Sequence, residues 1–267
     1  MVFLIKRNLK KAEHVIIFCL NIFYERYLHE RYNHLNILLS FLKDASMSDY
    51  RNVHVLPDSP WLSSLHLQAR DKTASLGTFV HFSNLIIRLL LESAAQYLPY
   101  SEKTVITPTG DIFQGKMLKN GVCGVSVIRA GESMEAEFRA MFPGATIGKI
   151  LIQRDKETKQ PHYFYSHLPP SLDSMSVMLF EPMLATGGSL LKAIEVLRES
   201  GVAVENIIVV NLLASPPGIE RVVKIWPTLK IVTSSIEEGL TEAAFMRPGI
   251  GDFGDRYFGT WPGAAHE

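Results

Sequence analysis

The segment 181–189, Glu-Pro-Met-Leu-Ala-Thr-Gly-Gly-Ser, combines a carboxylate with small and hydroxyl residues in an order that suits a phosphate-binding loop. It follows an apolar run that ends at Phe180 and precedes a helical pattern. The amides between Thr186 and Ser189 would then lie at a helix N-terminus, where unpaired N–H groups and the helix dipole attract anions. The carboxylate of Glu181 would accept hydrogen bonds from sugar hydroxyls. A ribose phosphate is the favoured ligand, and a plain strand-to-helix loop with Ser189 as its N-cap is the alternative.

Two other loops also follow strand-like runs. In the segment 128–133, Arg129 precedes small residues, so that its guanidinium and the backbone can both approach a ligand closely. A surface arginine followed by a helix capped by Ser133 is the alternative. The segment 153–161 is densely charged and continues without a strand signal to about Pro170. It is expected to form either a lid over a site or a solvated loop.

The segment 246–260 is rich in glycine, and residues 249–254 match the pattern G-x-G-x-x-G of dinucleotide-binding proteins. We reject that interpretation because too few residues follow for a crossover helix and a second strand. What remains is a loop that exposes backbone donors and acceptors together with the Asp252 carboxylate and the Phe253 ring. Such a loop suits a flat polar ring that is recognised along its edge.

These loops require a scaffold that positions them, and the apolar patterning predicts one. Short runs rich in β-branched residues predict five strands, at 122–128, 147–152, 177–180, 207–213 and 229–233. Helical patterns occupy 72–98, 133–141, 189–200 and 217–225, and two short runs at 104–107 and 112–118 predict a hairpin. Strands that alternate with helices indicate an α/β fold with a doubly wound parallel sheet, in which ligands bind beyond the carboxyl ends of the strands.

The composition of the 267 residues is that of a globular protein with a sizeable core, since 47% are hydrophobic and 20% are charged. Lys and Arg together number 27, as do Asp and Glu, and this balance argues against binding to nucleic acid or to a membrane through bulk charge. Two cysteines are too few for a disulfide framework or a structural zinc site. A reducing, cytoplasmic setting without nucleic-acid or membrane partners is therefore expected.

Residues 1–46 differ from the rest of the chain, because they contain neither glycine nor proline. Their apolar stretch 15–23 follows basic residues as in a secretory signal peptide, but no small-residue cleavage site comes after it, and it is too short to span a membrane. We expect residues 1–46 to form an extension that is helical or poorly ordered. Met47 is then a second candidate for the first residue of the native protein.

Four motifs, at 128–133, 152–155, 181–189 and 248–257, occur together in an order that resembles the uracil phosphoribosyltransferases. The resemblance extends from about residue 50 to 260 and is closer to the eukaryotic branch of fungi and protists. It implies an α/β fold of the type I phosphoribosyltransferase class, with a central five-stranded parallel sheet flanked by helices, a small hood and a β-hairpin arm. It also implies a phosphoribosyltransferase domain over residues 47–267.

The resemblance further implies a reaction of pyrimidine salvage, in which uracil and 5-phosphoribosyl 1-diphosphate (PRPP) give UMP and diphosphate. Mg²⁺ would be carried on PRPP, without direct protein ligands. The catalytic residues would be Asp252, Arg154 and Arg129. The PRPP-binding residues would be Arg129, Ala130, Gly131, Arg154, Glu181, Pro182, Met183, Leu184, Ala185, Thr186, Gly187, Gly188, Ser189 and Asp252. The uracil pocket would be lined by Met246, Gly251, Asp252 and Phe253.

One departure from the family pattern concerns Glu181, because the family usually has aspartate there. Its carboxylate reaches about 1.5 Å further, roughly one carbon–carbon bond, so a shifted ribose is expected rather than a different reaction. A catalytically inactive, UMP-binding regulator on the same fold is the main alternative. A detached domain of a bifunctional uridine kinase is another, which would lack kinase activity because no P-loop is present. The resemblance also implies a homodimer or homotetramer, with GTP as an effector in some members.

Overall fold

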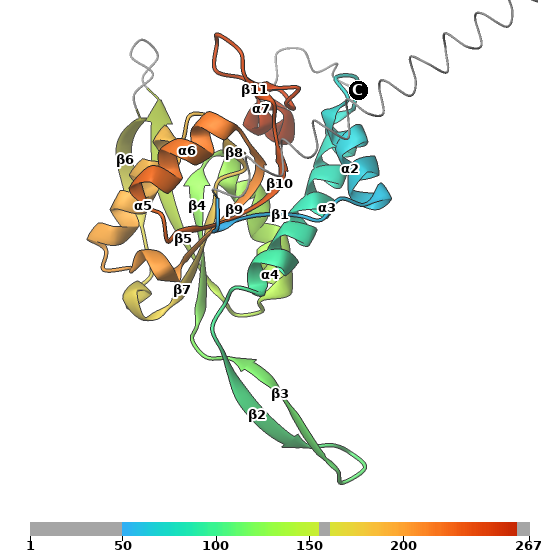
Figure 1. Cartoon of the computed structure of the whole chain (residues 1–267), viewed down its shortest axis with the longest axis vertical. Helices are drawn as coiled ribbons and strands as arrows, with labels where there is room; N and C mark the ends of the chain where they lie inside the picture. Colours follow the sequence, from blue (N-terminus) through green and yellow to red (C-terminus); the bar gives the residue numbers. More distant parts are fainter. Residues whose placement is uncertain (1–49, 155–160, 261–267) are drawn as a thin grey trace, which may run out of the picture. The chain divides into compact units, whose positions relative to one another are not determined.

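A computed structural model of the chain describes residues 50–154 and 161–260. These residues form one large sheet with helices on both of its faces and a two-stranded arm that leaves the sheet at one end, as Figure 1 shows. The segment 1–46, expected to be a separate extension, lies outside the described residues. The division of the chain at residue 47 therefore stays a prediction.

The large sheet is mainly parallel, as the alternation of strands and helices predicts. Its strand order is β1-β10-β9-β7-β4-β5-β6, and β8 pairs with β9 beside this path. The strands are β1 (Val53–Val55), β4 (Val122–Ile128), β5 (Thr146–Arg154), β6 (Pro161–His167), β7 (Ser176–Phe180), β8 (Met183–Leu184), β9 (Ile207–Ala214) and β10 (Lys230–Ile236). The five expected strands, β4, β5, β7, β9 and β10, are neighbours at the centre and all run parallel. The predicted α/β fold class is therefore confirmed.

The edge of the sheet differs from the expectation. The loop expected from residue 153 to about Pro170 is wrong over residues 161–167, which form β6 antiparallel to β5. Side chains of this strand are largely exposed, including Phe164 and Tyr165. A half-buried strand is recognised by alternating apolar and polar residues, and an edge strand with both faces exposed lacks that signal. Residues 155–160, the rest of the expected lid, lie outside the described residues.

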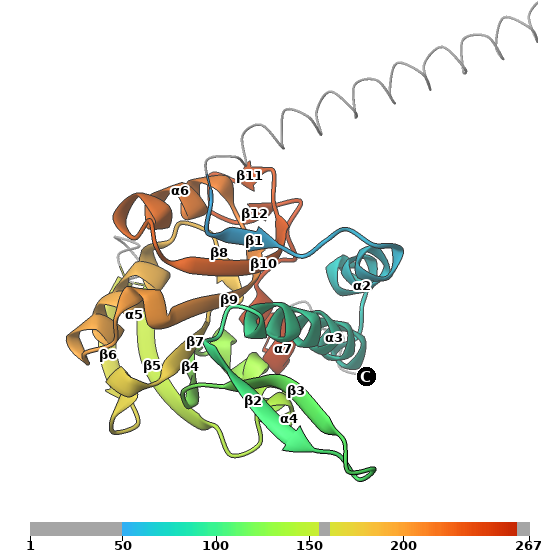
Figure 2. The ribbon, with the colours of Figure 1, turned by 60° about the horizontal axis from the view of Figure 1, so that its bottom comes forward.

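Two helical layers enclose the sheet, as Figure 2 shows. One contains α2 (Pro60–Arg70), α3 (Leu76–Ala95), α4 (Glu135–Met141) and α7 (Phe253–Phe258), and the other contains α5 (Gly188–Glu199) and α6 (Pro216–Ile225). Short 3-10 turns lie at Ala130–Met134, Leu172–Ser174 and Val204–Asn206. The expected helix at 72–98 is confirmed in the shorter form of α3, whereas the patterning did not predict α2. None of the helices in the described ranges is long and apolar enough to cross a membrane.

The C-terminal helix α7 is held against α3 by aromatic contacts. The buried ring of Phe253 lies 5.5 Å from the ring of Phe79, centroid to centroid. The guanidinium of Arg256 lies 4.1 Å from the centroid of the same Phe79 ring, and the hydroxyl of Tyr257 donates to Asn84 Oδ1 at 2.7 Å. The glycine-rich segment 246–260, expected to be a loop, therefore contains a packed helix in its second half.

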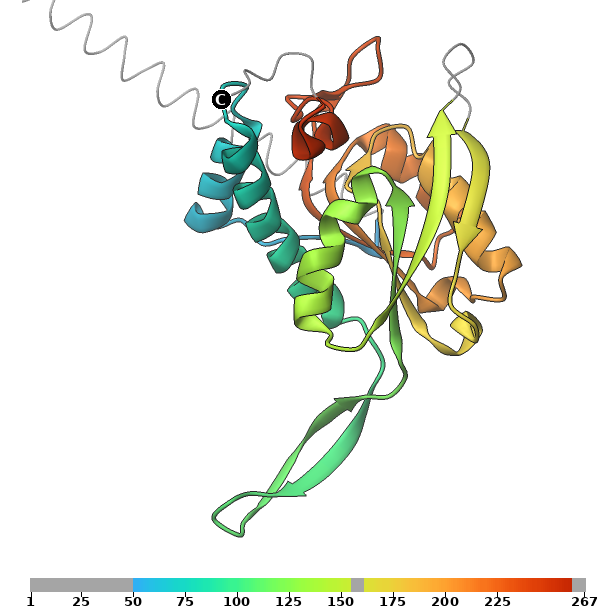
Figure 3. The same cartoon turned by 180° about the vertical axis from the view of Figure 1, so that it is seen from behind.

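The predicted hairpin is confirmed as an antiparallel pair of β2 (Tyr100–Ile106) and β3 (Ile112–Leu118). Figure 3 shows that this arm extends away from the sheet on the side opposite α7. The whole of β2 is exposed, and the arm carries exposed apolar side chains, among them Ile106, Ile112 and Phe113. Apolar surface that the rest of the described domain leaves uncovered is typical of an interaction site.

A second small sheet pairs β11 (Gly239–Leu240) with β12 (Met246–Arg247). We call residues 239–251 the hood, since they correspond to the small hood that the resemblance implies. The hood connects the end of β10 to the start of α7. Its position is therefore set from both sides by elements of the main fold.

Acid should destabilise this fold through His66, whose two ring nitrogens are buried on α2. Burial and the nearby charge of Arg70 lower the pKa of His66 from its usual 6.5 to about 4, although Glu237 acts in the opposite direction. Between these two values the unfolded chain binds more protons than the folded chain, so stability should rise with pH across this window and fall on acidification.

Thermal unfolding of the wild type and of His66→Leu, between about pH 4.5 and 7.5, measures this effect. The variant should show a flatter dependence of Tm on pH. His81→Leu removes an exposed imidazole from α3 and is the matched control. A His66→Leu protein with the wild-type slope would contradict the assignment.

Candidate active site

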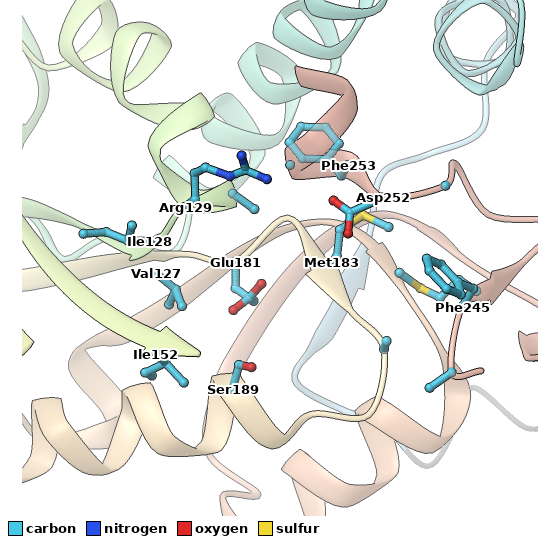
Figure 4. Close-up of a pocket in the computed structure, with 16 residues that line it drawn as sticks. Val127, Ile128, Arg129, Ile152, Glu181, Met183, Ser189, Phe245, Asp252 and Phe253 are labelled. Carbon is cyan, nitrogen blue, oxygen red and sulfur yellow. The ribbon is translucent and has the colours of Figure 1, made fainter. Parts of the chain in front are cut away.

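A cavity of about 350 Å³ opens at the carboxyl ends of β4, β5 and β7, where the four motifs of the sequence meet. Figure 4 shows the side chains that line it. The lining residues are Val127, Ile128, Arg129, Ala130, Ile152, Glu181, Met183, Ala185, Ser189, Ala244, Phe245, Met246, Gly251, Asp252, Phe253 and Gly254. Segments that are far apart in the chain therefore share one site, at the edge of the sheet where parallel α/β folds bind ligands.

The first turn of α5 faces this site and leaves its amides without a side-chain cap. The N-cap residue is Gly187, at a φ of +75°, and it makes no side-chain hydrogen bond to the helix. The alternative with Ser189 as N-cap is therefore wrong, because Ser189 lies inside the first turn. Amides at a helix N-terminus that no N-cap side chain satisfies are well suited to bind a phosphate.

Helix α6 supports the loop that leads into α5. Ser215 Oγ donates to the carbonyl oxygen of Ala185 at 2.5 Å and accepts from the amide of Gly218 at 3.1 Å. Arg221 Nη1 donates to the carbonyl oxygen of Thr186 at 3.3 Å and so brings a cation next to the loop. Sequence reasoning missed Arg221, because nothing in the segment around it points to a loop so distant in the chain.

A Gly218→Ala variant should lose most of its kcat/KM for a phosphorylated substrate. An added Cβ at Gly218 would lie 2.4 Å from the carbonyl oxygen of Ala185, so the loop must move. A displacement of about 1 Å near a reacting group can cost about 100-fold in rate, and we expect a loss of this order in kcat/KM. Steady-state kinetics with the phosphorylated substrate varied measures it.

Gly77→Ala is the matched control for this variant. Gly77 is exposed near the start of α3, and the closest atom to an added Cβ is Ser75 Oγ at 4.0 Å. Alanine is the better helix former, so this change should leave kcat/KM unchanged and should not lower Tm. Equal kinetic losses in the two variants would contradict the role of the loop.

Glu181 is buried at the floor of the cavity, with 8% of its surface exposed. Figure 4 shows its carboxylate turned into the cavity, between Arg129 and Ser189. Its backbone is fixed from the next strand, since Asn211 Nδ2 donates to the carbonyl oxygens of Glu181 at 2.8 Å and of Pro182 at 3.1 Å. The rigid floor therefore presents a carboxylate beside the helix N-terminus that can bind an anion.

Arg129 lies at the rim of the cavity and is held by the C-terminal segment. Its guanidinium donates to the carboxylate of Asp255 and to Thr260 Oγ1, the latter at 2.9 Å, and lies 5.5 Å from the centroid of the Phe258 ring. Hydrogen bonds from Thr260 and Arg129 hold the pKa of Asp255 below its usual range. Asp255 and Thr260 were not predicted, because their partner is distant in sequence.

Asp252 lines the same cavity and is the N-cap residue of α7. Its Oδ1 accepts from the amide of Asp255 at 2.9 Å, as an N-cap does. Gly251 and Met246 line the cavity from the hood, and the ring of Phe253 is drawn above Asp252 in Figure 4. This side of the site offers backbone groups, one carboxylate and apolar surface to a ligand.

The predicted site residues divide into those that line the cavity and those that flank it. Ten predicted residues line it: Arg129, Ala130, Glu181, Met183, Ala185, Ser189, Met246, Gly251, Asp252 and Phe253. The flanking residues are Gly131, Pro182, Leu184, Thr186, Gly187 and Gly188. Gly131 packs so closely on β7 that an added Cβ would lie 2.4 Å from the carbonyl oxygen of Phe180.

Arg154 ends β5, where it pairs with Pro161, and its side chain is outside what the structure describes. Its predicted role stays a prediction. Lining residues that the sequence reasoning missed are Val127, Ile128, Ile152, Ala244, Phe245 and Gly254. All of them adjoin a predicted motif or belong to one, so their nearness to the motifs was the available signal.

Comparisons with known proteins agree with this arrangement. Residues 55–260 match the family model described as uracil phosphoribosyltransferase. The uracil phosphoribosyltransferase of Dictyostelium discoideum is 46% identical to this chain over 214 residues, which cover 80% of this chain and 99% of that protein. The uracil phosphoribosyltransferase of Saccharomyces cerevisiae is 43% identical over 213 residues, with the same coverage of 80% and 99%.

Two further comparisons concern a longer protein and a solved structure. The uridine/cytidine kinase UKL1 of Arabidopsis thaliana is 44% identical over 211 residues, which cover 79% of this chain and 43% of that protein. The structure of the AQ2163 protein of Aquifex aeolicus superimposes with a TM-score of 0.68 at 28% identity, covering 77% of this chain and 97% of that chain. The similarity thus extends over nearly all of the described residues.

Proposed function

Because the chain belongs to the uracil phosphoribosyltransferase family, we propose that its cavity transfers a phosphoribosyl group from PRPP to uracil, with UMP and diphosphate as products. The bond between the anomeric carbon and the diphosphate oxygen breaks, and its electron pair leaves on diphosphate. The bond from this carbon to N1 of uracil forms, and the N1 proton is released. The enzyme is then a pentosyltransferase of pyrimidine salvage.

The observation that carries this proposal is the meeting of three binding features in one cavity. The uncapped N-terminus of α5 suits the 5-phosphate, the buried carboxylate of Glu181 suits the ribose hydroxyls, and the hood suits a small flat base. The anion site, the carboxylate and the hood thus match the phosphate, the ribose and the base of the product UMP.

The residue roles follow the order of these features. Residues 185–189 would hold the 5-phosphate, and Glu181, with Pro182, Met183 and Leu184 beside it, would face the ribose. Arg129, Arg154 and the backbone of Ala130 and Gly131 would hold the diphosphate. Met246, Gly251, Asp252 and Phe253 would surround uracil. The family resemblance and the lining of the cavity support these roles.

Catalysis in this site needs positioning and charge stabilisation rather than a covalent nucleophile. Breaking the bond to diphosphate leaves a ribose with oxocarbenium character and a leaving group with additional negative charge. Fixed cations stabilise the leaving group, and the hood holds N1 of uracil in line with the bond that breaks. Glu181 and Asp252 place negative charge near the developing positive charge of the sugar.

The donors of this site fit a magnesium ion that arrives with PRPP. Glu181 and Asp252 present carboxylate oxygens to the cavity, and Mg²⁺ prefers hard oxygen ligands. Within the described ranges no group of three His, Cys, Asp or Glu side chains could hold a metal by itself. We therefore propose that PRPP carries the ion into the site without direct protein ligands, and that these two carboxylates lie near it. When bound, Mg²⁺ neutralises charge on the leaving diphosphate.

The decisive experiment is UMP formation from uracil and PRPP in the presence of magnesium, with cytosine, hypoxanthine and orotate as control bases. UMP from uracil alone is the expected result. A folded protein that binds UMP but makes no product with any base would instead be the inactive regulator. None of the similar proteins named above is described as such a regulator.

Assembly, regulation and location are proposed on narrower grounds. A homodimer or homotetramer is supported by the exposed apolar side chains of Ile106, Ile112 and Phe113 on the arm, and sedimentation equilibrium measures it. GTP as an effector rests on the resemblance alone. The cytoplasmic location rests on the resemblance and on the low cysteine content.

A further inference from the structure

A buried ion pair lies directly beneath the hood. Arg70, the last residue of α2, and Glu237, which follows β10, form a two-pronged contact. Nη2 of Arg70 lies 2.7 Å from Oε1 of Glu237, and Nη1 donates to Oε2 at 2.8 Å. The side chain of Glu237 is 1% exposed and that of Arg70 is 21% exposed. A bidentate pair this well shielded from water has a strongly preferred geometry.

Both partners of this pair also bind the backbone of the same hood residue. The amide of Gly249 donates to Glu237 Oε2 at 2.6 Å, and Nη1 of Arg70 donates to the carbonyl oxygen of Gly249 at 3.0 Å. Ser235 Oγ donates to Glu237 Oε1 at 3.1 Å and completes the shell around the carboxylate. The pair therefore fixes the peptide groups on both sides of Gly249 rather than a side chain.

Gly249 lies between Met246 and Gly251, two of the four hood residues that line the cavity. Its φ is +68°, and an added Cβ would lie 2.1 Å from the carbonyl oxygen of Met246. The backbone of Gly249 therefore packs directly against that of Met246. We expect a displacement of Gly249 to shift the part of the cavity that would face the base.

The electrostatics favour a positioning role over a role in stability alone. Burial by itself would raise the pKa of Glu237, but hydrogen bonds from Arg70 and the amide of Gly249 lower it below its usual range. Relative to an apolar pair of similar volume, such an ion pair contributes little net stability, because desolvating two charges costs about as much as their attraction returns. It does impose one geometry, and lysine cannot replace arginine at a bidentate contact.

We propose that Arg70 and Glu237 are positioning residues that hold the hood in the position, relative to the rest of the cavity, that base binding requires. This inference rests on the proposed function and adds two residues that do not line the cavity. The hood would contact uracil largely through its main chain, so a small shift of the 246–251 backbone would weaken base binding directly. The N-terminus of α5, which would bind the 5-phosphate of PRPP, lines the cavity through Ser189, on a segment separate from the hood.

The test compares two Arg–Glu ion pairs in one protein, the shielded pair beneath the hood and a more exposed pair. Glu237→Gln and Arg70→Lys weaken the pair beneath the hood. Glu137→Gln weakens the pair of Glu137 on α4 with Arg88 on α3, in which Oε2 of Glu137 lies 2.7 Å from Nη2 of Arg88. Loss of a hydrogen bond to a charged group costs about tenfold or more in the equilibrium that the bond stabilises, here the placement of the hood, so KM for uracil should rise about tenfold in the first two variants. KM for PRPP should stay within about twofold, and the control should leave both values unchanged.

Hydrogen–deuterium exchange of the peptide that contains Gly249 gives a readout independent of activity. The amide of Gly249 should exchange about tenfold faster in Glu237→Gln, while amides of α3 keep their wild-type rates. If the wild type makes no UMP, the proposed function fails, and the exchange measurement still tests the contact. An unchanged KM for uracil in both variants of an active enzyme would overturn the inference. Equal acceleration of exchange in the hood and in α3 would overturn it as well, because it would show a general loss of stability.

Discussion

An Arg129→Ala enzyme should turn over uracil about a hundred- to a thousandfold more slowly than the wild type, with its fold intact. The leaving diphosphate gains negative charge as its bond to ribose breaks, and a fixed cation beside it stabilises the transition state more than the substrate. Bonds to Asp255 and Thr260 take two of the five N–H donors of the guanidinium, so the side chain is oriented without being saturated. The quantity to measure is kcat at saturating uracil and PRPP.

Two further variants show whether this loss is specific. Arg129→Lys keeps the charge but cannot bind Asp255, Thr260 and a phosphate oxygen in one planar arrangement, so it should recover only part of kcat. Arg88→Ala removes an arginine that also pairs with a carboxylate, that of Glu137, and should retain wild-type kcat. Wild-type turnover in Arg129→Ala would show that the assigned role is wrong.

Asp252→Asn should lower kcat about 100-fold and leave Tm nearly unchanged. Asp252 has two tasks, because it caps α7 through the amide of Asp255 and presents a carboxylate to the cavity. Asparagine caps a helix as well as aspartate does, so this change removes the charge and keeps the cap. The charge should matter because the ribose becomes positive in the transition state. Activity assays and thermal unfolding of the same sample measure the two effects separately.

Asp252→Ala separates the two tasks further. Alanine removes the charge and the cap, so its kcat should match that of Asp252→Asn, while its stability should be lower by about 1 kcal/mol. If Asp252→Asn were fully active and Asp252→Ala inactive, Asp252 would act only as the cap of α7, and the catalytic assignment would fall.

Local patterns in the sequence were sufficient for the elements that carry the site. The apolar run 177–180 and the helical period after Ser189 place residues 181–189 between a strand and a helix, as β7 and α5 confirm. This works because burial on both faces of a parallel strand leaves a continuous apolar run, and because helices repeat on one face. The order of the four motifs then pointed to the site residues, and ten of these predicted residues line one cavity.

Other features depend on contacts that no local pattern contains. The edge strand β6 exists because it pairs with β5, although its own residues 161–167 are exposed. The N-cap of α5 is Gly187 rather than Ser189. Gly187 has a left-handed backbone conformation, and α6 packs so closely against it that a larger residue would not fit. Both outcomes depend on a neighbour that is distant in the chain.

The same holds for the charged partners around the site. Arg70 and Glu237 are 167 positions apart, and Arg129 and Asp255 are 126 positions apart. Residue type and spacing show that these side chains can bind anions, cations or backbone groups. Which partner each one binds depends on how α2, α7 and the end of β10 pack together. The residue types in short sequence segments thus determine which chemistry the site can perform. Its geometry depends on long-range packing, because an ion pair or hydrogen bond forms only when its partners are brought within about 3 Å of each other.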